Sequence, residues 1–447
     1  MEAVPRKLVA KERESIVRTE FIHLADIHLG TEQYGSPHRY NDFARAFQWV
    51  AHYAIQRRVQ FLAISGDLFN THSLDPMTLN QAVMILQELR AARIPVLAIE
   101  GNHDRSHYKS LMSWLQFLSD QELLHLLDLV PEDGRQRALP WDANSRRGSY
   151  LDLDGVRVCG MRYFGAATAR LVGEVAQELE TAPAPNVQYT VFLMHAGMEG
   201  YIPHMTGGLT YAQVEPLHSA VNYLGLGHIH KAYEEHDWVY NPGSTETWRV
   251  DEASWKRGLY HISVDTSAER PHQVCHVVNP RRPFHRIWLD VDRLHSPQML
   301  YDAAREVIEE ETPGIRQCEE AARRGGLDDV RPVVHLFLRG VLPFDRQDLE
   351  LDHLQQSVRD VSGALLAQIK DDTRPTEYAV TLGSAERMDR AELEQSVFRQ
   401  LLERDARYRP ASVEVAKHTA RIKAQALEGA SPESIVEVLR QVRTELT

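Results

Sequence analysis

The first half of the chain repeats one unit, a short apolar run that ends in a cluster of Asp, His, Asn and Gly residues. Apolar runs of this length between turn residues are typical of buried strands. Each run therefore delivers polar side chains at the carboxyl end of a strand. The runs cover residues 21–25, 61–65, 96–100, 190–194 and 223–226.

Amphipathic helices are expected between these runs. Apolar residues recur at helical spacing within 41–54 and 76–93. Asp75 is a suitable N-cap for the second helix, because Pro76 then takes the first helical position. Strands that alternate with helices predict an α/β sheet with helices on its faces. Ligands of such sheets gather beyond the carboxyl ends of the strands, which is where the polar clusters lie.

The pattern changes after Pro283. Apolar and polar positions alternate over 287–291, residues 333–338 form a dense strand candidate, and 300–311 and 349–361 have helical periodicity. This part predicts a second, smaller α+β domain, followed from residue 389 by helices only, with Gly429 as a C-cap. The expected parts are a loose extension at 1–20, a main domain at 21–283, a small domain at 284–384 and a helical region at 385–447.

The composition is ordinary for a soluble protein, and the charge restricts the partners of the chain. The 447 residues carry 50 Lys and Arg against 63 Asp and Glu, a formal net charge of −13. This charge opposes wholesale nucleic-acid binding, although a bound metal can supply the positive field that a phosphate meets. The three cysteines form no Cys-x-x-Cys pair, and no apolar stretch reaches membrane-spanning length. We expect a cytoplasmic protein without an export signal or a membrane segment.

The strand-end clusters contain the side chains of a metal site. Asp26 and His28 are two residues apart, as are His228 and His230, so alternation along an extended segment turns each pair to one side. Carboxylate, amide and imidazole ligands without a thiolate suit Mn²⁺ first, then Fe²⁺ or Zn²⁺. Seven ligands exceed the needs of one ion, so we expect two ions with a shared carboxylate. The seven are Asp26, His28, Asp67, Asn102, His195, His228 and His230.

Each cluster taken alone is weak evidence for function. A single buried histidine is more often a hydrogen-bonded core residue than a ligand, and Gly-Asp is usually a turn. Gly66, Gly101 and Gly227 stand just before ligands, where a sharp turn with positive φ is expected. A pair of metal ions clamps a phosphate, lowers the pKa of a bridging water and stabilises the leaving oxygen. The joint pattern therefore indicates phosphoester hydrolysis.

The order of the clusters resembles that of the calcineurin-like metallophosphoesterases. Asp-x-His, Gly-Asp, Gly-Asn-His-Asp, His and Gly-His-x-His follow one another between residues 21 and 243. The strings HLADIHLG (23–30), AIEGNHDR (98–105) and GLGHIHK (225–231) are similar to those of DNA double-strand-break repair nucleases of the SbcD type. The resemblance implies a four-layer α/β sandwich, a capping domain that binds DNA at 284–384 and a partner-binding helical region at 385–447.

The same resemblance implies roles for individual residues. Asp67 would bridge the two metals. His103 would lie over the scissile phosphate as a general acid or a stabiliser of the transition state. The alternative is that His103 is a solvent-exposed turn residue without a catalytic role. One metal would be held by Asp26, His28, Asp67 and His230, and the other by Asp67, Asn102, His195 and His228.

Three neighbours of these residues have open roles. Asp104 either orients His103 or caps a turn. Many members of the family carry a second active-site histidine three residues after the bridging aspartate, where this chain has Asn70. The difference leaves open how a DNA backbone is positioned. His72 either compensates for the missing histidine or is a surface loop residue.

Two stretches are candidates for contacts with DNA. Arginines and aromatic residues are concentrated between 135 and 170, where they either track a DNA backbone or form a solvated face with core aromatics. The neighbourhood of Gln33, Tyr34, His38 and Arg39 is a similar candidate. The first stretch contains Arg135, Arg137, Arg146, Arg147, Arg157, Arg162 and Arg170, with Tyr150, Tyr163 and Phe164 between them.

The resemblance also implies partners. A coiled-coil ATPase of the ABC type would bind the helical region, and helices 41–54 and 76–93 would form a two-fold homodimer. We therefore expect a manganese-dependent exonuclease and endonuclease that acts on DNA ends in double-strand-break repair, near the nucleoid. A phosphodiesterase or phosphatase on the same core is the alternative. A non-catalytic scaffold for the ATPase is disfavoured, because all seven ligands are present.

Overall fold

The computed structural model describes residues 16–106, 112–201, 208–375, 390–405, 407–427 and 431–445. Gly429 and the expected boundary at 384 lie outside the described residues. The chain divides into two compact units. The expected assignment of separate functions to its parts stays a prediction. One unit takes its residues from Met1–Arg282 and Glu320–Val330, the other from Pro283–Glu319 and Arg331–Thr447.

The first unit is built on two six-stranded sheets whose central strands are parallel. Parallel strands present their carboxyl ends at one edge, so the polar clusters of each sheet meet there. The first sheet has the order β14 (His272–Val278), β13 (Gly258–Asp265), β1 (Arg18–Leu24), β2 (Phe61–Ile64), β3 (Val96–Ala98) and β4 (His125–Leu126). The second has the order β11 (Tyr233–Glu235), β12 (Val239–Asn241), β10 (Tyr223–Leu226), β9 (Tyr189–Met194), β8 (Val156–Met161) and β7 (Tyr150–Leu153).

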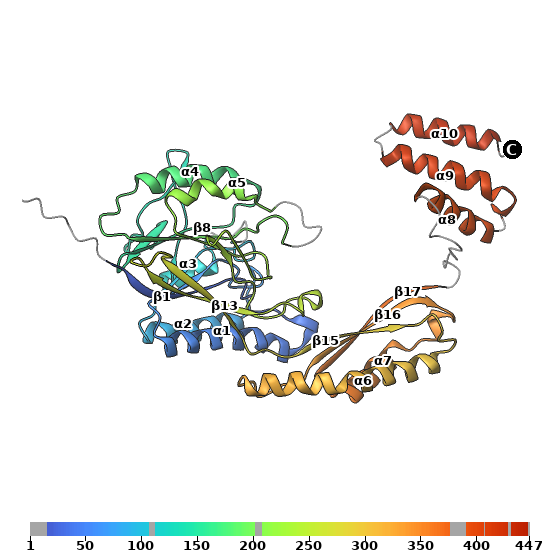
Figure 1. Cartoon of the computed structure of the whole chain (residues 1–447), viewed down its shortest axis with the longest axis horizontal. Helices are drawn as coiled ribbons and strands as arrows, with labels where there is room; N and C mark the ends of the chain where they lie inside the picture. Colours follow the sequence, from blue (N-terminus) through green and yellow to red (C-terminus); the bar gives the residue numbers. More distant parts are fainter. Residues whose placement is uncertain are drawn as a thin grey trace, which may run out of the picture. The chain divides into compact units, whose positions relative to one another are not determined.

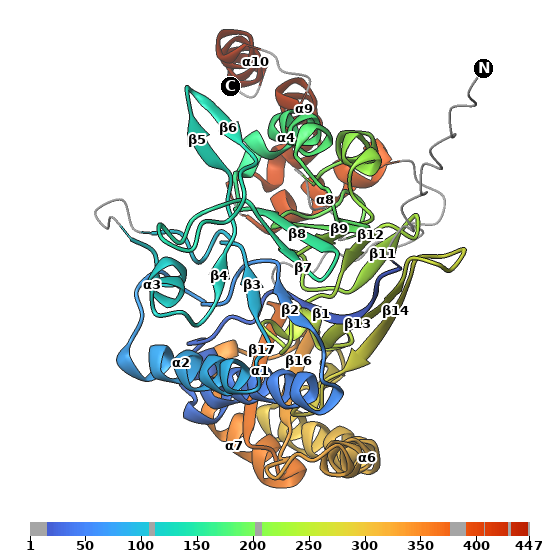
Figure 2. The same ribbon diagram turned by 90° about the vertical axis from the view of Figure 1, so that its left-hand side faces the viewer.

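Helices cover the outer faces of the two sheets, as Figures 1 and 2 show. Helices α1 and α2 lie on the first sheet, and α4 and α5 lie on the second. The expected four-layer α/β sandwich is therefore confirmed. The remaining elements of this unit are α1 (Pro37–Arg57), α2 (Pro76–Ala91), α3 (Trp114–Asp120), the hairpin of β5 (Val130–Glu132) and β6 (Arg135–Arg137), α4 (Thr168–Thr181) and α5 (Tyr211–Val214).

Three apolar clusters fill the spaces between the four layers. Ile22 of β1 packs in the cluster that contains Phe47 of α1, whereas the adjacent Phe21 contacts Tyr223 of the second sheet. A third cluster joins the second sheet to α4. Both faces of the central strands are thus buried, which explains why β2 and β3 are apolar at every position.

Strand β1 begins at Arg18, three residues before the expected start of order. Its first residues pair with β13, and Nε of Arg18 lies 2.9 Å from Oδ2 of Asp265. Only Thr19 among the first three residues is buried. The prediction of a loose extension over 1–20 is therefore wrong for 16–20, because alternate burial leaves this part of the strand polar. Residues 1–15 lie outside the described residues.

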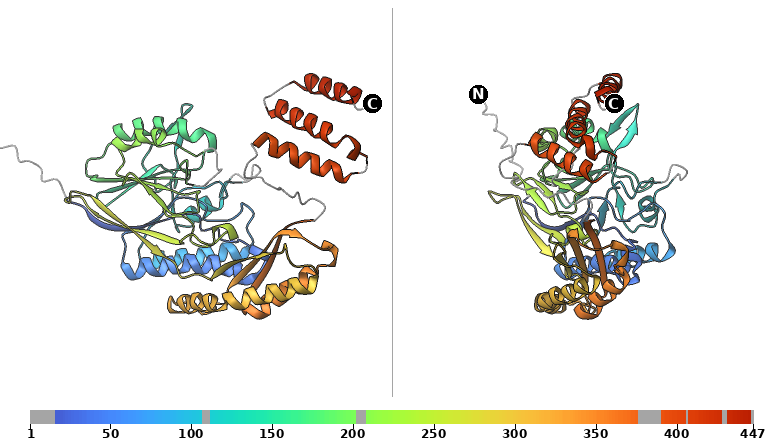
Figure 3. Two further views of the ribbon diagram at one scale, coloured as in Figure 1. Left: turned by 45° about the vertical axis from the view of Figure 1, so that its right-hand side comes forward. Right: turned by 90° about the vertical axis from the view of Figure 1, so that its right-hand side faces the viewer.

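The second unit contains a parallel three-stranded sheet in the order β15-β16-β17. Leu300 and Ile308 of α6 and Leu354 of α7 share one apolar cluster with Leu336 and Leu338 of the central strand. Helix α9 lies between α8 and α10 (Figure 3). The elements are β15 (Phe284–Asp290), α6 (Pro297–Arg324), β16 (Val333–Leu342), α7 (Leu351–Ser362), β17 (Leu366–Pro375), α8 (Arg390–Arg404), α9 (Ser412–Leu427) and α10 (Pro432–Glu445). Across the described ranges, no helix combines the length and the apolar composition needed to cross a membrane.

A buried ion network fixes helix α1 of the first unit. The carboxylate of Asp42 accepts hydrogen bonds from Arg39 and from Nε of Arg282, the latter at 2.7 Å, and all three side chains are essentially inaccessible. Burial alone would raise the pKa of Asp42, but the guanidinium groups of Arg282 and Arg39 hold that pKa below its usual value. Arg39 also donates to the carbonyl oxygen of Thr247 at 3.0 Å. Its burial is contrary to the expected role of Arg39 in contacting DNA.

Replacement of Asp42 by alanine should destabilise the first unit by about 3–5 kcal/mol, because the charges of Arg39 and Arg282 would stay buried without this partner. The midpoint of urea-induced unfolding measures the loss. The matched control is Arg18→Ala, which removes the exposed ion pair with Asp265 and should cost at most about 1 kcal/mol. Equal shifts of the midpoint in the two variants would contradict the account of the network.

Candidate metal centre

Loops at the carboxyl ends of five strands bring the seven predicted ligands together. The loops come from both sheets, so the site lies at the edge where the carboxyl ends of the two sheets meet. Asp26 and His28 follow β1, Asp67 follows β2, Asn102 follows β3, His195 follows β9, and His228 and His230 follow β10.

Four of these residues form a first set. The Nε2 atoms of His28 and His230 lie 3.1 Å apart. Oδ2 of Asp67 is 3.9 Å from Nε2 of His28, and Oδ1 of Asp26 is 3.9 Å from Nε2 of His230. All four side chains are buried. Asp26, His28 and His230 thus have ligand atoms close enough together to hold one ion.

A second set shares Asp67 with the first. Nε2 of His195 lies 3.2 Å from Oδ2 of Asp67 and 3.1 Å from Oδ1 of Asn102. The same Asn102 oxygen is 3.0 Å from Nδ1 of His228. The grouping is the one that the resemblance implies, with Asp67 common to both sets, although the role of these residues as metal ligands stays a prediction.

The chemistry of the second set fits a cation. Nδ1–H of His195 donates to the carbonyl oxygen of Ser65 at 2.7 Å, so its Nε2 atom faces the oxygens of Asp67 and Asn102. Burial would lower the pKa of His195, but the carboxylate of Asp67 raises it to about 9. Nε2 of His195 and the oxygens of Asp67 and Asn102 thus converge on one point, where a divalent ion can accept an electron pair from each of them. Nitrogen and oxygen donors without sulfur suit Mn²⁺, Fe²⁺ or Zn²⁺.

The first set is also electrostatically unfavourable without a cation. Burial raises the pKa of Asp26 to about 6 and lowers the pKa of His28 well below its usual value. Nδ1 of His28 is buried and has no hydrogen-bond partner among the described atoms. Burial alone would raise the pKa of Asp67, yet the neighbouring His195 holds it below its usual value. A bound metal ion supplies the charge that these groups lack.

Left-handed backbone brings the ligands together. We expected strand alternation to turn Asp26 and His28, and also His228 and His230, to one side. Instead, φ is 53° at Asp26, 52° at His28 and 79° at His228, so the prediction of extended segments is wrong. Asp67, with φ of 53°, has the same backbone conformation. Non-glycine residues in this region are uncommon, and their concentration at one site is typical of functional sites.

The three glycines of the site serve two purposes. Gly66 has φ of +89°, as expected for a turn. Gly101 and Gly227 do not have positive φ, and there the expectation is wrong. They permit close approach instead, because a Cβ atom at Gly101 would lie 2.0 Å from Oδ1 of Asp67 and one at Gly227 would lie 2.3 Å from the Ser65 carbonyl oxygen.

Glu252 is a site residue that the sequence did not indicate. Its Oε1 atom lies 3.0 Å from Nδ1 of His230, and its Oε2 atom accepts a 2.8 Å hydrogen bond from Arg257. Arg257 also donates to the His230 carbonyl oxygen at 2.7 Å. A carboxylate on the distal nitrogen fixes the tautomer and ring orientation of a histidine ligand. Glu252 lies 22 residues after His230, outside every strand-end cluster.

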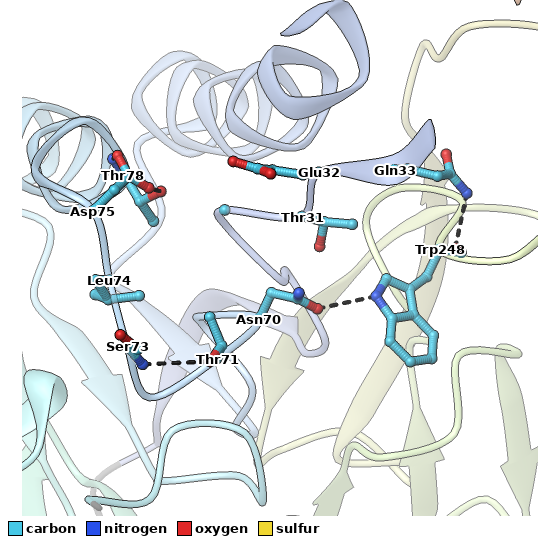
Figure 4. A pocket seen from close by; sticks show the side chains of 11 residues that line it. Thr31, Glu32, Gln33, Asn70, Thr71, Ser73, Leu74, Asp75, Thr78 and Trp248 are labelled. Atoms are coloured by element: carbon cyan, nitrogen blue, oxygen red, sulfur yellow. Dashed lines mark hydrogen bonds between the residues drawn. The ribbon is translucent and has the colours of Figure 1, made fainter. Parts of the chain in front are cut away.

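Trp248 is a second residue that the motifs did not indicate. Its indole stacks on His28, with ring centroids 5.3 Å apart and an interplanar angle of 18°. Figure 4 shows that its Nε1–H group donates to Oδ1 of Asn70, at 3.0 Å, and that its carbonyl oxygen accepts from Gln33. Trp248 lines two cavities, one of about 510 Å³ and one of about 290 Å³ that is also lined by four of the predicted ligands. Gln33, an expected DNA contact, is therefore part of the support of Trp248.

His103 lies beside the ligands in the same cavity. Its Nδ1–H group donates to the carbonyl oxygen of Asn70 at 2.7 Å, and its amide N–H donates to Oδ1 of Asp67 at 2.9 Å. Asn70 thus holds His103 through its backbone and Trp248 through its side chain. His72, the proposed compensating residue, is exposed, and its carbonyl oxygen accepts a hydrogen bond from Trp114.

Asp104 bonds to backbone amides of two loops. Its carboxylate accepts from the N–H groups of Gly101 and Phe69, each at 3.0 Å, and these bonds fit the turn-capping alternative. Burial, followed by the charge of Asp67, raises the pKa of Asp104 to about 7. Asp104 therefore ties the loop after β3 to the loop after β2.

The arginines between 135 and 170 are mostly paired with carboxylates, which favours the solvated face over a DNA track. Arg157 is buried, makes two hydrogen bonds to Asp152, and stacks on Tyr150. Tyr163 is the aromatic residue of this stretch that reaches the site, with its ring 5.6 Å from that of His228. Further ion pairs join Arg137 to Glu178, Arg146 to Glu122, Arg162 to Asp128, and Arg170 to Glu174.

Comparison with protein families matches residues 19–232 to the calcineurin-like phosphoesterases. This part of the chain belongs to that family. The match runs from β1 to just after His230 and so includes all seven predicted ligands, and the expected fold and family are confirmed. The family match makes this part of the chain a hydrolase of the dinuclear-metal phosphoesterase type, and the candidate metal-binding groups agree with that class.

Several relatives share more than this domain. A protein of Aeropyrum pernix named "DNA double-strand break repair protein Mre11" is 26% identical over 73% of this chain and 74% of its own length. A protein of the same name from Archaeoglobus fulgidus is 31% identical over 53% of this chain and 52% of its own length. A third, from Sulfolobus acidocaldarius, is 22% identical over 75% of this chain and 78% of its own length. The narrower resemblance seen in the motifs agrees with these names.

Replacement of Glu252 by glutamine should weaken binding of Mn²⁺ by about 10- to 100-fold, because an amide supports the Nδ1–H group of His230 less well than a carboxylate. Titration calorimetry of the metal-free protein measures the affinity. The matched control is Glu174→Gln, which removes an exposed carboxylate that pairs with Arg170 and should leave metal binding unchanged. Wild-type affinity in Glu252→Gln would refute the proposed support of His230.

Proposed function

We propose that this protein is a manganese-dependent DNA nuclease, with exonuclease and endonuclease activity, that acts on DNA ends in double-strand-break repair. The observation that carries the proposal is the sharing of Asp67 between two sets of ligands. This arrangement suits phosphodiester hydrolysis, because the two ions of such a site would stabilise the attacking and the leaving oxygen. The names of the relatives support DNA as the substrate.

Two Mn²⁺ ions are the proposed cofactors, with Fe²⁺ or Zn²⁺ as possible replacements. Asp26, His28, Asp67 and His230 would hold one ion, and Asp67, Asn102, His195 and His228 would hold the other. When bound, the ions clamp the phosphate and lower the pKa of a water molecule to make a nucleophile at neutral pH. Their charge also attracts DNA to a protein whose own net charge is −13.

His103 is the proposed general acid or transition-state stabiliser. Its Nδ1 proton is committed to the carbonyl oxygen of Asn70, so Nε2 is the atom that can exchange a proton with a substrate. The ring of His103 lines the cavity, and its centroid is 4.9 Å from the ring centroid of His28. An imidazole in this position could donate its Nε2 proton to a leaving oxygen. Asn70 then acts on substrate positioning through His103 and Trp248.

The same proposal covers partners and location. A coiled-coil ATPase of the ABC type would bind helices α8–α10, where exposed Leu427, Val436 and Leu439 offer apolar contacts. A homodimer would form through α1 and α2, with Met77 and Met84 exposed on α2. Residues 284–384 would cap the DNA, and the protein would work in the cytoplasm at the nucleoid.

Replacement of His103 by alanine should lower the rate of DNA cleavage by about 10²- to 10⁴-fold, the usual contribution of a positioned acid. Both metal ions should still bind, because His103 lies outside both ligand sets. Cleavage rates and calorimetric metal titration check the two statements. His72→Ala is the control for a nearby histidine and should cleave DNA at the wild-type rate. Loss of metal in His103→Ala would contradict the assignment.

A substrate panel separates the nuclease from the alternative phosphodiesterase or phosphatase. Purified protein is incubated with linear duplex DNA, hairpin DNA and a chromogenic phosphodiester, each with Mn²⁺ and with Mg²⁺. Cleavage of DNA with Mn²⁺ is the expected result. Turnover of the small ester without DNA cleavage, even after addition of the ATPase, would favour the alternative.

A further inference from the structure

A hollow of about 540 Å³ lies next to the cavity that is lined by the candidate ligands Asp67, Asn102, His228 and His230. The two spaces share a wall, because Trp255 lines both of them. The hollow is formed by the chain that directly follows His230 and by the segment that leads into β13. A chain-like substrate whose reacting group lies at the metal centre can therefore extend past Trp255 into the hollow.

Two lysines line this hollow. Lys231 and Lys256 are exposed and line it, and neither has an ion pair with a carboxylate in the described part of the chain. Glu234 is a carboxylate that also lines the hollow. In contrast, five of the seven arginines between 135 and 170 are paired with carboxylates. Because the chain has a net charge of −13, unpaired cations beside the metal centre are important for attracting an anionic substrate.

The lysines are held in a fixed position relative to the ligands. Lys231 is the residue after His230, and Lys256 is the residue before Arg257. Arg257 is fully buried and donates to the carbonyl oxygen of His230 at 2.7 Å and to that of Glu252 at 3.0 Å. One buried guanidinium therefore joins the two backbone segments that carry the lysines.

Trp255 offers a surface for an unpaired base. Its side chain is half-buried, and the guanidinium carbon of Arg257 lies 5.5 Å from the ring centroid. A cation on one side of an indole fixes the ring and leaves it suited to stacking. Aromatic rings beside cations are the usual elements of single-strand binding sites, where rings stack on bases and cations contact phosphates.

We propose that this hollow binds the single-stranded segment of DNA next to the scissile phosphate, with Lys231 and Lys256 on its phosphates and Trp255 stacked on a base. The inference rests on the proposed nuclease function and adds the path of the strand and the need for unpaired bases. Arg249, which lines the metal cavity and lies 4.6 Å from the ring centroid of Trp248, continues the positive charge toward the ligands.

The salt dependence of binding tests the path directly. Binding of a fluorescent single-stranded oligonucleotide is measured in EDTA over a range of salt concentrations, so that only side-chain cations contribute. Each of Lys231→Gln and Lys256→Gln should reduce the slope of log K against log salt by about 0.7, the value for one phosphate contact on a single strand. Lys231→Arg and Lys256→Arg should restore it. Trp255→Ala should weaken binding about fivefold or more at every salt concentration without a change of slope.

The control is Arg170→Gln, which makes the same change of net charge on α4, where Arg170 pairs with Glu174. This variant should keep the wild-type slope. Wild-type slopes in both lysine-to-glutamine variants, or an equal reduction in Arg170→Gln, would overturn the inference. Because both lysines are exposed, their variants decide the question even if Trp255→Ala fails to fold.

Cleavage of DNA by the unchanged protein tests the proposed function separately. If the wild-type protein fails to cleave DNA but the two lysine variants lower the slope, the strand path stands and the nuclease proposal fails. If the wild-type protein cleaves DNA and the slopes do not change, the nuclease proposal stands and the strand path fails.

Discussion

The carboxylate of Asp67 is the interaction on which the rest of the site depends. One oxygen accepts the amide N–H of His103, and the other lies 3.2 Å from His195 and 3.9 Å from His28. The chain approaches it so closely that Gly101 has no room for a Cβ atom. A buried carboxylate surrounded by imidazoles and other oxygens needs a strong positive charge, and this need determines what the centre can bind.

The surrounding structure holds this centre in place from several directions. Asp104 joins the loop after β3 to the loop after β2 through backbone amides. Glu252 and Arg257 fix His230, while Asn70 fixes both His103 and Trp248. These partners act on orientation, and metal sites of this kind lose much of their affinity when such partners are removed. The left-handed conformations of the ligands are maintained by this network rather than by local preference.

The sequence was sufficient for the strands and for the convergence of the candidate ligands, because both leave strong local signals. Short apolar runs followed by Asp, His and Asn marked the carboxyl ends of five strands, and all seven side chains meet there. The means of their convergence was not predictable, since φ at Asp26 or His228 is not encoded in spacing. Glu252 and Trp248 were missed because they reach the site from a loop without a repeated pattern. The sequence left two roles open for the arginines, because their pairing with carboxylates depends on residues distant in sequence.

The most direct measurement is anomalous diffraction from a crystal of the full chain soaked in Mn²⁺. The account predicts two peaks about 3.5–4 Å apart, the separation typical of such metal pairs, with Asp67 in contact with both. His28 and His230 should contact one peak, and His195 and His228 the other. A single peak, an empty site, or two peaks that do not share Asp67 would contradict the central claim.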